Sequence, residues 1–219
     1  MATSNVKQEI KDQFIWDDRI LSSNIFVDIM DGTVKLSGEV PDLGSRKAAE
    51  EDALSISGVK HVENNIKVTY PESIVIPTDE QIKDSLIELL NLDDGINAKD
   101  LAIKVSDGVV TMNGTVDASW KKDVIQGYSY RITGVKDVID QTTIKHTREY
   151  SDEEITTDIK KAFQRNDPYT TKNIRVEVQN GRVTLSGKVP SYVTRMRVKE
   201  MVKYTSGVGE VIDDLVIGK

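Results

Sequence analysis

The chain has 219 residues, of which 38% are hydrophobic, 30% are charged and only 5% are aromatic. This composition is typical of a soluble globular protein whose core consists of aliphatic side chains. Its net charge of -7 argues against a general nucleic-acid binder, because such proteins usually carry a basic surface for the phosphates. The absence of cysteine excludes disulfides, zinc–thiolate sites and thiol nucleophiles.

The N-terminal residues, MATSNVKQEIKDQF, contain no apolar stretch of the length that a signal peptide needs. No later apolar run approaches the length of a membrane span. As written, the sequence predicts a cytoplasmic protein, or a periplasmic one if a leader has been removed.

Three similar segments indicate an internal repeat. They are DGTVKLSGEV from Asp31, DGVVTMNGTV from Asp107 and NGRVTLSGKV from Asn180. In each copy a second glycine follows the turn glycine by six positions, and a third follows by a further twenty positions. The three glycine sets are Gly32, Gly38 and Gly58; Gly108, Gly114 and Gly134; and Gly181, Gly187 and Gly207. We therefore predict three tandem domains, at residues 1–70, 77–147 and 150–219.

Each repeat is predicted to begin with an amphipathic helix, because apolar residues recur there at every fourth position. These are Val6, Ile10 and Phe14; Ile82, Leu86 and Leu90; and Ile155, Ile159 and Phe163. The pairs Thr78/Gln81 and Ser151/Glu154 are typical capping boxes for the second and third of these helices.

Two strands with alternating apolar residues follow, joined by Asp-Gly or Asn-Gly. Such dipeptides favour a type I′ hairpin turn, in which both central residues have positive φ. The second strand carries its glycine, for example Gly38 or Gly187, on the apolar face. We expect that glycine to allow the close approach of a helix backbone.

A second helix then begins near Gly44, Trp120 and Val193, and it ends before the third glycine of the repeat. A final strand completes the order helix, strand, strand, helix, strand. Because a helical connection between strands implies parallel pairing, we expect a three-stranded mixed sheet with both helices on one face. The predicted fold class is α+β, with three tandem αββαβ domains.

The run Asp/Asn-Gly-x-Val-x-Leu-Ser-Gly-x-Val, then a helix and Gly-Val-x-x-Val, resembles the BON domain over essentially the whole chain. The middle copy differs mildly, with Met112 and Asn113 in place of Leu-Ser. The resemblance implies the αββαβ fold and a bacterial, non-enzymatic protein associated with osmotic or envelope stress. It also implies binding to phospholipid surfaces, and it implies no cofactor.

Charge is distributed unevenly: the first two repeats are net negative and the third is net positive. The predicted second helix of the third repeat, SYVTRMRVKEMVKYT, carries much of the excess. Each basic residue close to an anionic membrane contributes about 1 kcal/mol, so this helix could hold the protein there weakly. The alternatives are an ordinary solvated face or a contact with the acidic repeats. The candidate lipid-binding residues are Tyr192, Arg195, Arg197, Lys199 and Lys203.

No other motif indicates chemistry. His61 and His146 occupy non-equivalent repeat positions without ligand-type neighbours, so we interpret them as surface histidines. The acidic pairs Asp17-Asp18, Asp93-Asp94 and Asp213-Asp214 lack the alternating oxygen ligands of a calcium loop, and we expect each in a solvated loop or at a strand edge. No catalytic residue and no metal site is predicted.

Two other functions remain open. Short linkers and complementary charge between repeats favour a scaffold that presents surfaces to a protein partner or to a second copy of the chain. Potassium or osmotic sensing is the third possibility, because a potassium site of backbone carbonyls leaves no side-chain signature.

Overall fold

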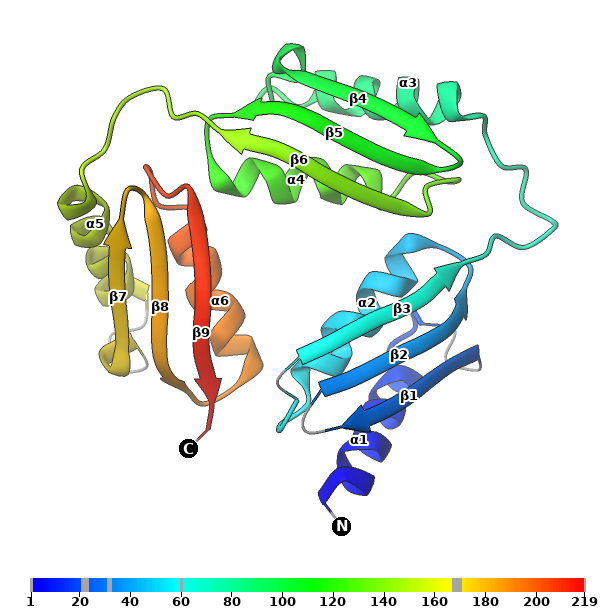
Figure 1. Cartoon of the computed structure of the whole chain (residues 1–219), viewed down its shortest axis with the longest axis horizontal. Helices are drawn as coiled ribbons and strands as arrows, with labels where there is room; N and C mark the ends of the chain where they lie inside the picture. Colours follow the sequence, from blue (N-terminus) through cyan, green and yellow to red (C-terminus); the bar gives the residue numbers. More distant parts are fainter. Residues whose placement is uncertain (1, 21–23, 31–32, 60, 167–170, 219) are drawn as a thin grey trace. The chain divides into compact units, whose positions relative to one another are not determined.

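A computed structural model describes residues 2–20, 24–30, 33–59, 61–166 and 171–218 of the chain. It contains three αββαβ repeats, as predicted (Figure 1). The first repeat consists of α1 (Ala2–Trp16), β1 (Ile25–Met30), β2 (Thr33–Val40), α2 (Leu43–Ser55) and β3 (His61–Val68). The second consists of α3 (Asp79–Leu92), β4 (Leu101–Ser106), β5 (Val109–Val116), α4 (Ser119–Ser129) and β6 (Asp137–Ile144). The third consists of α5 (Asp152–Asn166), β7 (Ile174–Gln179), β8 (Arg182–Val189), α6 (Tyr192–Lys203) and β9 (Glu210–Ile217).

Every repeat has a three-stranded sheet in which the second strand lies in the middle. In the first repeat β1 pairs antiparallel with β2, and β3 pairs parallel with β2. The third repeat has the same arrangement in β7, β8 and β9. A tight turn can join only antiparallel neighbours, whereas the helix between the second and third strands allows the parallel return. Both helices of each repeat lie on the same face of its sheet (Figure 1), which confirms the predicted mixed sheet.

Each core lies between the sheet and this helix pair. Along β2 the side chains of Val34, Leu36 and Val40 are buried while their neighbours face outward. They pack in one cluster with Ile10 and Phe14 of α1. The helix face predicted from apolar residues at every fourth position is therefore the buried face of α1. The corresponding faces of α3 and α5 are buried as well. Among the described residues, no helix is long and apolar enough to cross a bilayer.

The hairpin turns of the second and third repeats have the predicted geometry. Asp107 and Gly108 have φ of 53° and 77°, and Asn180 and Gly181 have φ of 51° and 73°. Residues 31–32, the corresponding turn of the first repeat, lie outside the described residues. Positive φ at both central positions matches the right-handed twist of the flanking strands, so this dipeptide sets the register of each hairpin.

A carboxylate holds each of these two turns from the first residue of the preceding helix. Asp79 of α3 accepts hydrogen bonds from the backbone N–H of Asp107 at 2.8 Å and of Gly108 at 2.9 Å. In the third repeat Asp152 of α5 accepts in the same way from the two residues of its own turn, at 2.9 and 3.0 Å. The turn amides thus have partners that lie 28 or 29 residues earlier in the chain.

The strand glycine is required by a close backbone approach, as expected. Gly38, Gly114 and Gly187 have φ between 116° and 126°, and a Cβ on any of them would overlap a carbonyl oxygen. For Gly114 and Gly187 that oxygen belongs to Asp100 and Asn173, at the ends of short 3₁₀ helices (Ala98–Asp100 and Thr171–Asn173). The approaching backbone is therefore that of a short 3₁₀ helix just before the first strand, and not that of one of the two long helices of the repeat.

Helix ends follow the predicted signals. Thr78 and Gln81 form a reciprocal capping box at the start of α3. Ser151 and Glu154 do so at the start of α5, where the hydrogen bonds from Ser151 hold the pKa of the Glu154 carboxyl below its ordinary value. The glycine after each second helix has positive φ, and the valine that follows it is buried in every repeat.

Candidate functional site

Helix α6, on which sequence analysis placed all five candidate residues, is fixed to the third sheet by its apolar face. Ser191 caps its start by accepting a hydrogen bond from the backbone N–H of Thr194 at 3.2 Å. Val198 and Val202 are buried against the sheet. These contacts set the rotation of the helix about its axis, and this rotation separates the candidate residues into different environments.

Arg195 and Lys199 lie at the edge of α6 that faces β9. Arg195 Nε donates to Asp213 Oδ2 at 2.9 Å, and Lys199 Nζ lies 3.3 Å from the same oxygen. The Asp213 side chain is only 10% exposed, although it lies on β9, an edge strand of its sheet, which is one of the two positions expected for it. Two cations of the predicted basic surface are thus paired with one carboxylate of their own domain.

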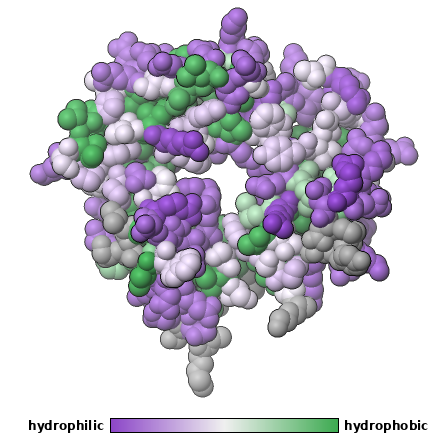
Figure 2. Space-filling view, turned by 180° about the vertical axis from the view of Figure 1, so that it is seen from behind, coloured by the Kyte–Doolittle hydropathy of each residue, from purple (hydrophilic) through white to green (hydrophobic). Residues whose placement is uncertain are grey.

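Arg197 lies on the other side of α6 and is exposed. Within the described part of the chain it forms no ion pair. Val193 and Tyr204, one turn before it and two turns after it, are 62% and 64% exposed. Figure 2, which views the chain from behind relative to Figure 1, shows hydrophobic residues in separate patches among hydrophilic ones. The α6 stripe, which we define as Val193, Arg197 and Tyr204, combines one cation with two apolar side chains.

The other two candidates are less exposed. Tyr192 is partly buried at the first position of α6. Lys203 is partly buried in the last turn, where a cation interacts favourably with the helix dipole. The structure therefore divides the five residues, and Arg197 is the one whose charge faces solvent.

Beside the α6 stripe, a groove of about 740 Å³ runs between α5 and α6. Its apolar wall includes Ala162 and Met201, and its basic groups are Arg197 and Arg165 of α5. We call it the α5–α6 groove. Arg165 was missed in the sequence because it lies on a different helix from the basic cluster. Its spacing from Phe163, the last apolar residue of α5, could have placed it on the outer face of the helix pair.

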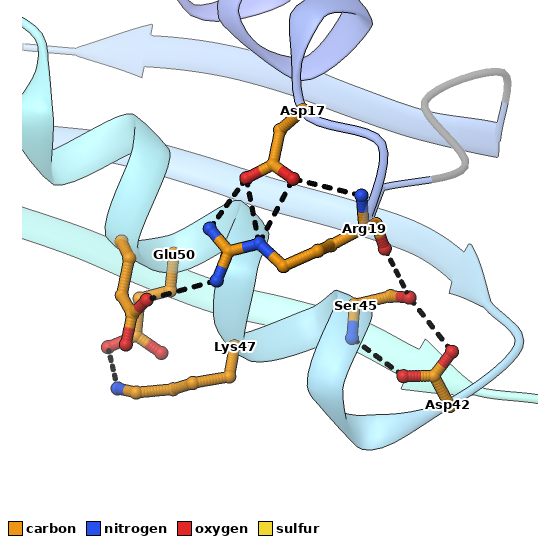
Figure 3. Close-up of polar contacts among 7 residues, drawn as sticks. Asp17, Arg19, Asp42, Ser45, Lys47 and Glu50 are labelled. Carbon is orange, nitrogen blue, oxygen red and sulfur yellow. Dashed lines mark hydrogen bonds and ion pairs between the residues drawn. The ribbon is translucent and has the colours of Figure 1, made fainter.

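The first repeat carries a different polar cluster, which connects the end of α1 to α2 (Figure 3). Asp17 accepts hydrogen bonds from Arg19 Nε at 3.0 Å and from Nη2 at 2.6 Å, and this guanidinium lowers the pKa of the Asp17 carboxyl. The hydroxyl of Ser45 donates to the carbonyl of Arg19 at 2.7 Å and lies 2.9 Å from Asp42 Oδ2. Donors and acceptors are satisfied within the cluster, so it stabilises the repeat rather than presenting a site.

Asp52 of α2 lies next to this cluster and is only 7% exposed. Its Oδ2 atom has no hydrogen-bond partner among the described residues. Burial first, and then the charge of Asp17, raise the pKa of the Asp52 carboxyl above its ordinary value. Burying a carboxylate with one oxygen left without a partner is costly, so the charged form is disfavoured at this position.

The histidines and carboxylates form no metal centre in the described ranges of the chain, where no group of three or more His, Cys, Asp or Glu could hold an ion. His61 is exposed at the start of β3. His146 is partly buried, and its Nδ1 atom lies 2.9 Å from the carbonyl oxygen of Asp117. The candidate site therefore remains the surface of the third repeat described above.

Comparison with known proteins gives one family and two curated relatives. The family model described as "BON domain" matches residues 2–70, 78–146 and 151–219. Osmotically-inducible protein Y of Escherichia coli (strain K12) is 28% identical over 128 residues, which are 56% of this chain and 64% of that protein. An "Uncharacterized protein in gshII 5'region" of Anaplasma centrale is 30% identical over 128 residues, covering 58% of this chain and 85% of the relative.

Among solved structures, the C-terminal domain of CdsD, a structural protein of the type III secretion system of Chlamydia trachomatis, aligns over 97% of this chain and 96% of its own. The sequence identity is 13% and the TM-score is 0.28. A similarity at that level supports no conclusion about function.

Proposed function

The chain belongs to the BON domain family, with three copies of the domain, and from this premise we propose that it is a non-enzymatic protein of the osmotic stress response. We further propose that its third repeat binds anionic phospholipid surfaces weakly. The family agrees with the one indicated by the glycine pattern. The name of the Escherichia coli relative, osmotically-inducible protein Y, supports the link to osmotic conditions.

The observation that carries the lipid proposal is the α6 stripe. Arg197 is flanked by exposed Val193 and Tyr204, so a cation and apolar groups face the same way. Amphipathic surfaces of this kind lie at the boundary between headgroups and acyl chains, where the apolar groups are buried and the cation meets anionic lipid. Arg165 of the neighbouring helix adds a second exposed cation.

The affinity is expected to be low. Two basic residues at an anionic surface contribute about 2 kcal/mol together, at about 1 kcal/mol each. Arg195 and Lys199 contribute less, because Asp213 already neutralises part of their charge. Salt at physiological strength screens charges beyond about 8 Å, so binding should decrease strongly as salt is raised.

The test is flotation with vesicles that contain phosphatidylglycerol in phosphatidylcholine, compared with vesicles of phosphatidylcholine alone. The informative variant is Arg197→Glu, because this side chain forms no ion pair with any of the described residues. Lys188→Glu is the matched control: it makes the same charge change in the same domain, on the exposed side of β8. That side is opposite to the buried Val183, Leu185 and Val189, which face the helices.

We expect the wild type and Lys188→Glu to float with anionic vesicles at low salt, and Arg197→Glu to remain at the bottom. If the wild type does not float at low salt, the lipid proposal is wrong, and a search for a protein partner becomes the next step. Equal losses in both variants would mean that net charge, rather than the α6 stripe, determines binding.

A further inference from the structure

The groove between the two helices differs among the three repeats at equivalent positions. Counting back six residues from the glycine after the second helix gives Asp52, Tyr128 and Met201. Counting back ten residues gives Ala48, Val124 and Arg197. Since each copy has the same fold, these residues occupy the same places on α2, α4 and α6.

In the first two repeats these positions contribute to contacts between the helices. Ala48 and Asp52 are buried within the first repeat. In the second repeat the hydroxyl of Tyr128 on α4 donates to Asp93 Oδ2, just after α3, at 2.7 Å. The second repeat thus uses this position to join its second helix to the end of its first, whereas in the first repeat a buried side chain fills it.

In the third repeat the same positions border an open cavity. Met201 has no polar group with which to reach Asn166, the residue at the place of Asp93. Ala162 is smaller than the equivalent residues Gln13 and Leu89 of the other repeats. The resulting α5–α6 groove has a volume of about 740 Å³, which lies within the range of about 300–1,000 Å³ usual for small-molecule sites.

The lining of the groove has a cationic part and an apolar part. Arg165 and Arg197 form no ion pair within the described residues, whereas Asp158 is matched by Lys161 at 3.2 Å. Glu200 is the other carboxylate of the lining, so its four charged side chains balance, and its two positive charges are those of Arg165 and Arg197. Ala162 and Met201 supply apolar surface, and the hydroxyls of Thr194, Thr205 and Ser206 also line the groove.

We propose that the α5–α6 groove binds a single anionic amphiphile, with a phosphate group held by Arg165 and Arg197 and an acyl portion against Ala162 and Met201. Guanidinium groups suit this role because their fork of N–H donors matches phosphate oxygens. The apolar wall distinguishes such a ligand from a free phosphate, which would leave that wall without a contact.

The inference rests on the proposed function in that both use Arg197, but it is a separate claim. Electrostatic attraction to a membrane needs only exposed charge, whereas capture of one molecule needs the volume of the groove. A substitution that fills the groove without changing its charge therefore separates the two. Ala162→Leu does so, and it places in α5 the residue that the second repeat has at this position, Leu89.

The experiment is calorimetric titration of the full chain with dihexanoyl-phosphatidylglycerol, kept below the concentration at which it forms micelles. Glycerol 3-phosphate serves as the headgroup alone, and dihexanoyl-phosphatidylcholine tests the need for net negative charge. We expect saturable binding of the first lipid, with at least about tenfold weaker binding of the other two probes. Ala162→Leu and Arg165→Gln should each weaken this binding at least about tenfold, while Lys188→Gln leaves it unchanged.

Ala162→Leu should still float with anionic vesicles, because it retains every charge. Absence of saturable binding by the short-chain lipid would overturn the inference even if flotation succeeds, and would leave the proposed function in place. Binding of glycerol 3-phosphate as tight as that of the lipid would also overturn it, since the apolar wall would then contribute nothing. Arg165→Gln keeps the test valid if Ala162→Leu does not fold, because Arg165 is exposed.

Discussion

The carboxylate that holds each hairpin turn provides a quantitative test of the fold. Asp79 accepts hydrogen bonds from the backbone N–H groups of Asp107 and Gly108. Asp79→Ala removes both acceptors and leaves the capping box of Thr78 and Gln81 intact. The substitution should therefore weaken the attachment of the turn to α3 without melting the start of the helix.

The expected loss follows from those contacts. Each hydrogen bond contributes about 0.5–1.5 kcal/mol net, and somewhat more with a charged acceptor. A carboxylate in the first turn of a helix adds about 0.3–1 kcal/mol through the helix dipole. Because Asp79 is only partly buried, we expect a decrease of about 2 kcal/mol in the free energy of unfolding of the second repeat.

The second repeat can be followed separately because the chain has two tryptophans, Trp16 in the first repeat and Trp120 in α4. Trp16 is 87% exposed, so Trp16→Phe should be neutral and leaves Trp120 as the fluorescent probe. With urea slopes of about 1–3 kcal/mol per M, Asp79→Ala should lower the unfolding midpoint by roughly 1–2 M. Asp84→Ala, an exposed position on the same helix, is the control. Equal midpoints for the two variants would refute the assigned role of Asp79.

Three further predictions use the same urea titration, followed by circular dichroism. Gly187→Ala should destabilise the third repeat by at least about 3 kcal/mol through positive φ and carbonyl overlap, whereas Gly209→Ala, with no such overlap, should be tolerated. Burial raises the pKa of the Asp52 carboxyl above its ordinary value of 3.8. The stability that the protonated carboxyl allows is fully present below pH 3.8, and it is lost as the pH rises through the folded-state pKa and the buried group becomes charged. Asp52→Asn should therefore be more stable than the wild type at neutral pH, and this difference should disappear near pH 3.8; a constant difference across pH would contradict the assignment. Arg195→Gln should cost about 1–2 kcal/mol, because Asp213 keeps only one cation, and an unchanged midpoint would count against that ion pair.

Most of the backbone could be predicted from the sequence because it depends on local rules. The fourfold spacing of Ile82, Leu86 and Leu90 identified a buried helix face, and all three are buried in α3. Dipeptides such as Asn180-Gly181 required positive φ at neighbouring positions, and they have it. The parallel pairing of the third strand could be predicted from the helical connection alone.

The pairing of side chains could not be predicted in this way. Arg195 meets Asp213 across 18 residues, and that contact depends on the register of β9 and the rotation of α6. The sequence of the helix alone predicted a basic surface, but it could not show that Asp213 pairs with part of that surface. In the same way, the carbonyl that approaches Gly187 comes from Asn173, at the end of a short 3₁₀ turn that the sequence analysis did not identify.

The three repeats can be compared as variants of one backbone, and the comparison indicates where their functions differ. Positions that need glycine have glycine in every copy, because any other residue would meet a carbonyl or adopt a strained φ. Position 52 and its equivalents have no such constraint, and there the chain places Asp52, Tyr128 and Met201. A buried acid, a hydroxyl that reaches the end of the opposite helix and a flexible apolar side chain give three different contacts between the helices of the same fold. If the repeats have separate tasks, the helix pairs rather than the sheets should determine them, and exchanging these side chains between repeats should transfer ligand binding without changing the fold.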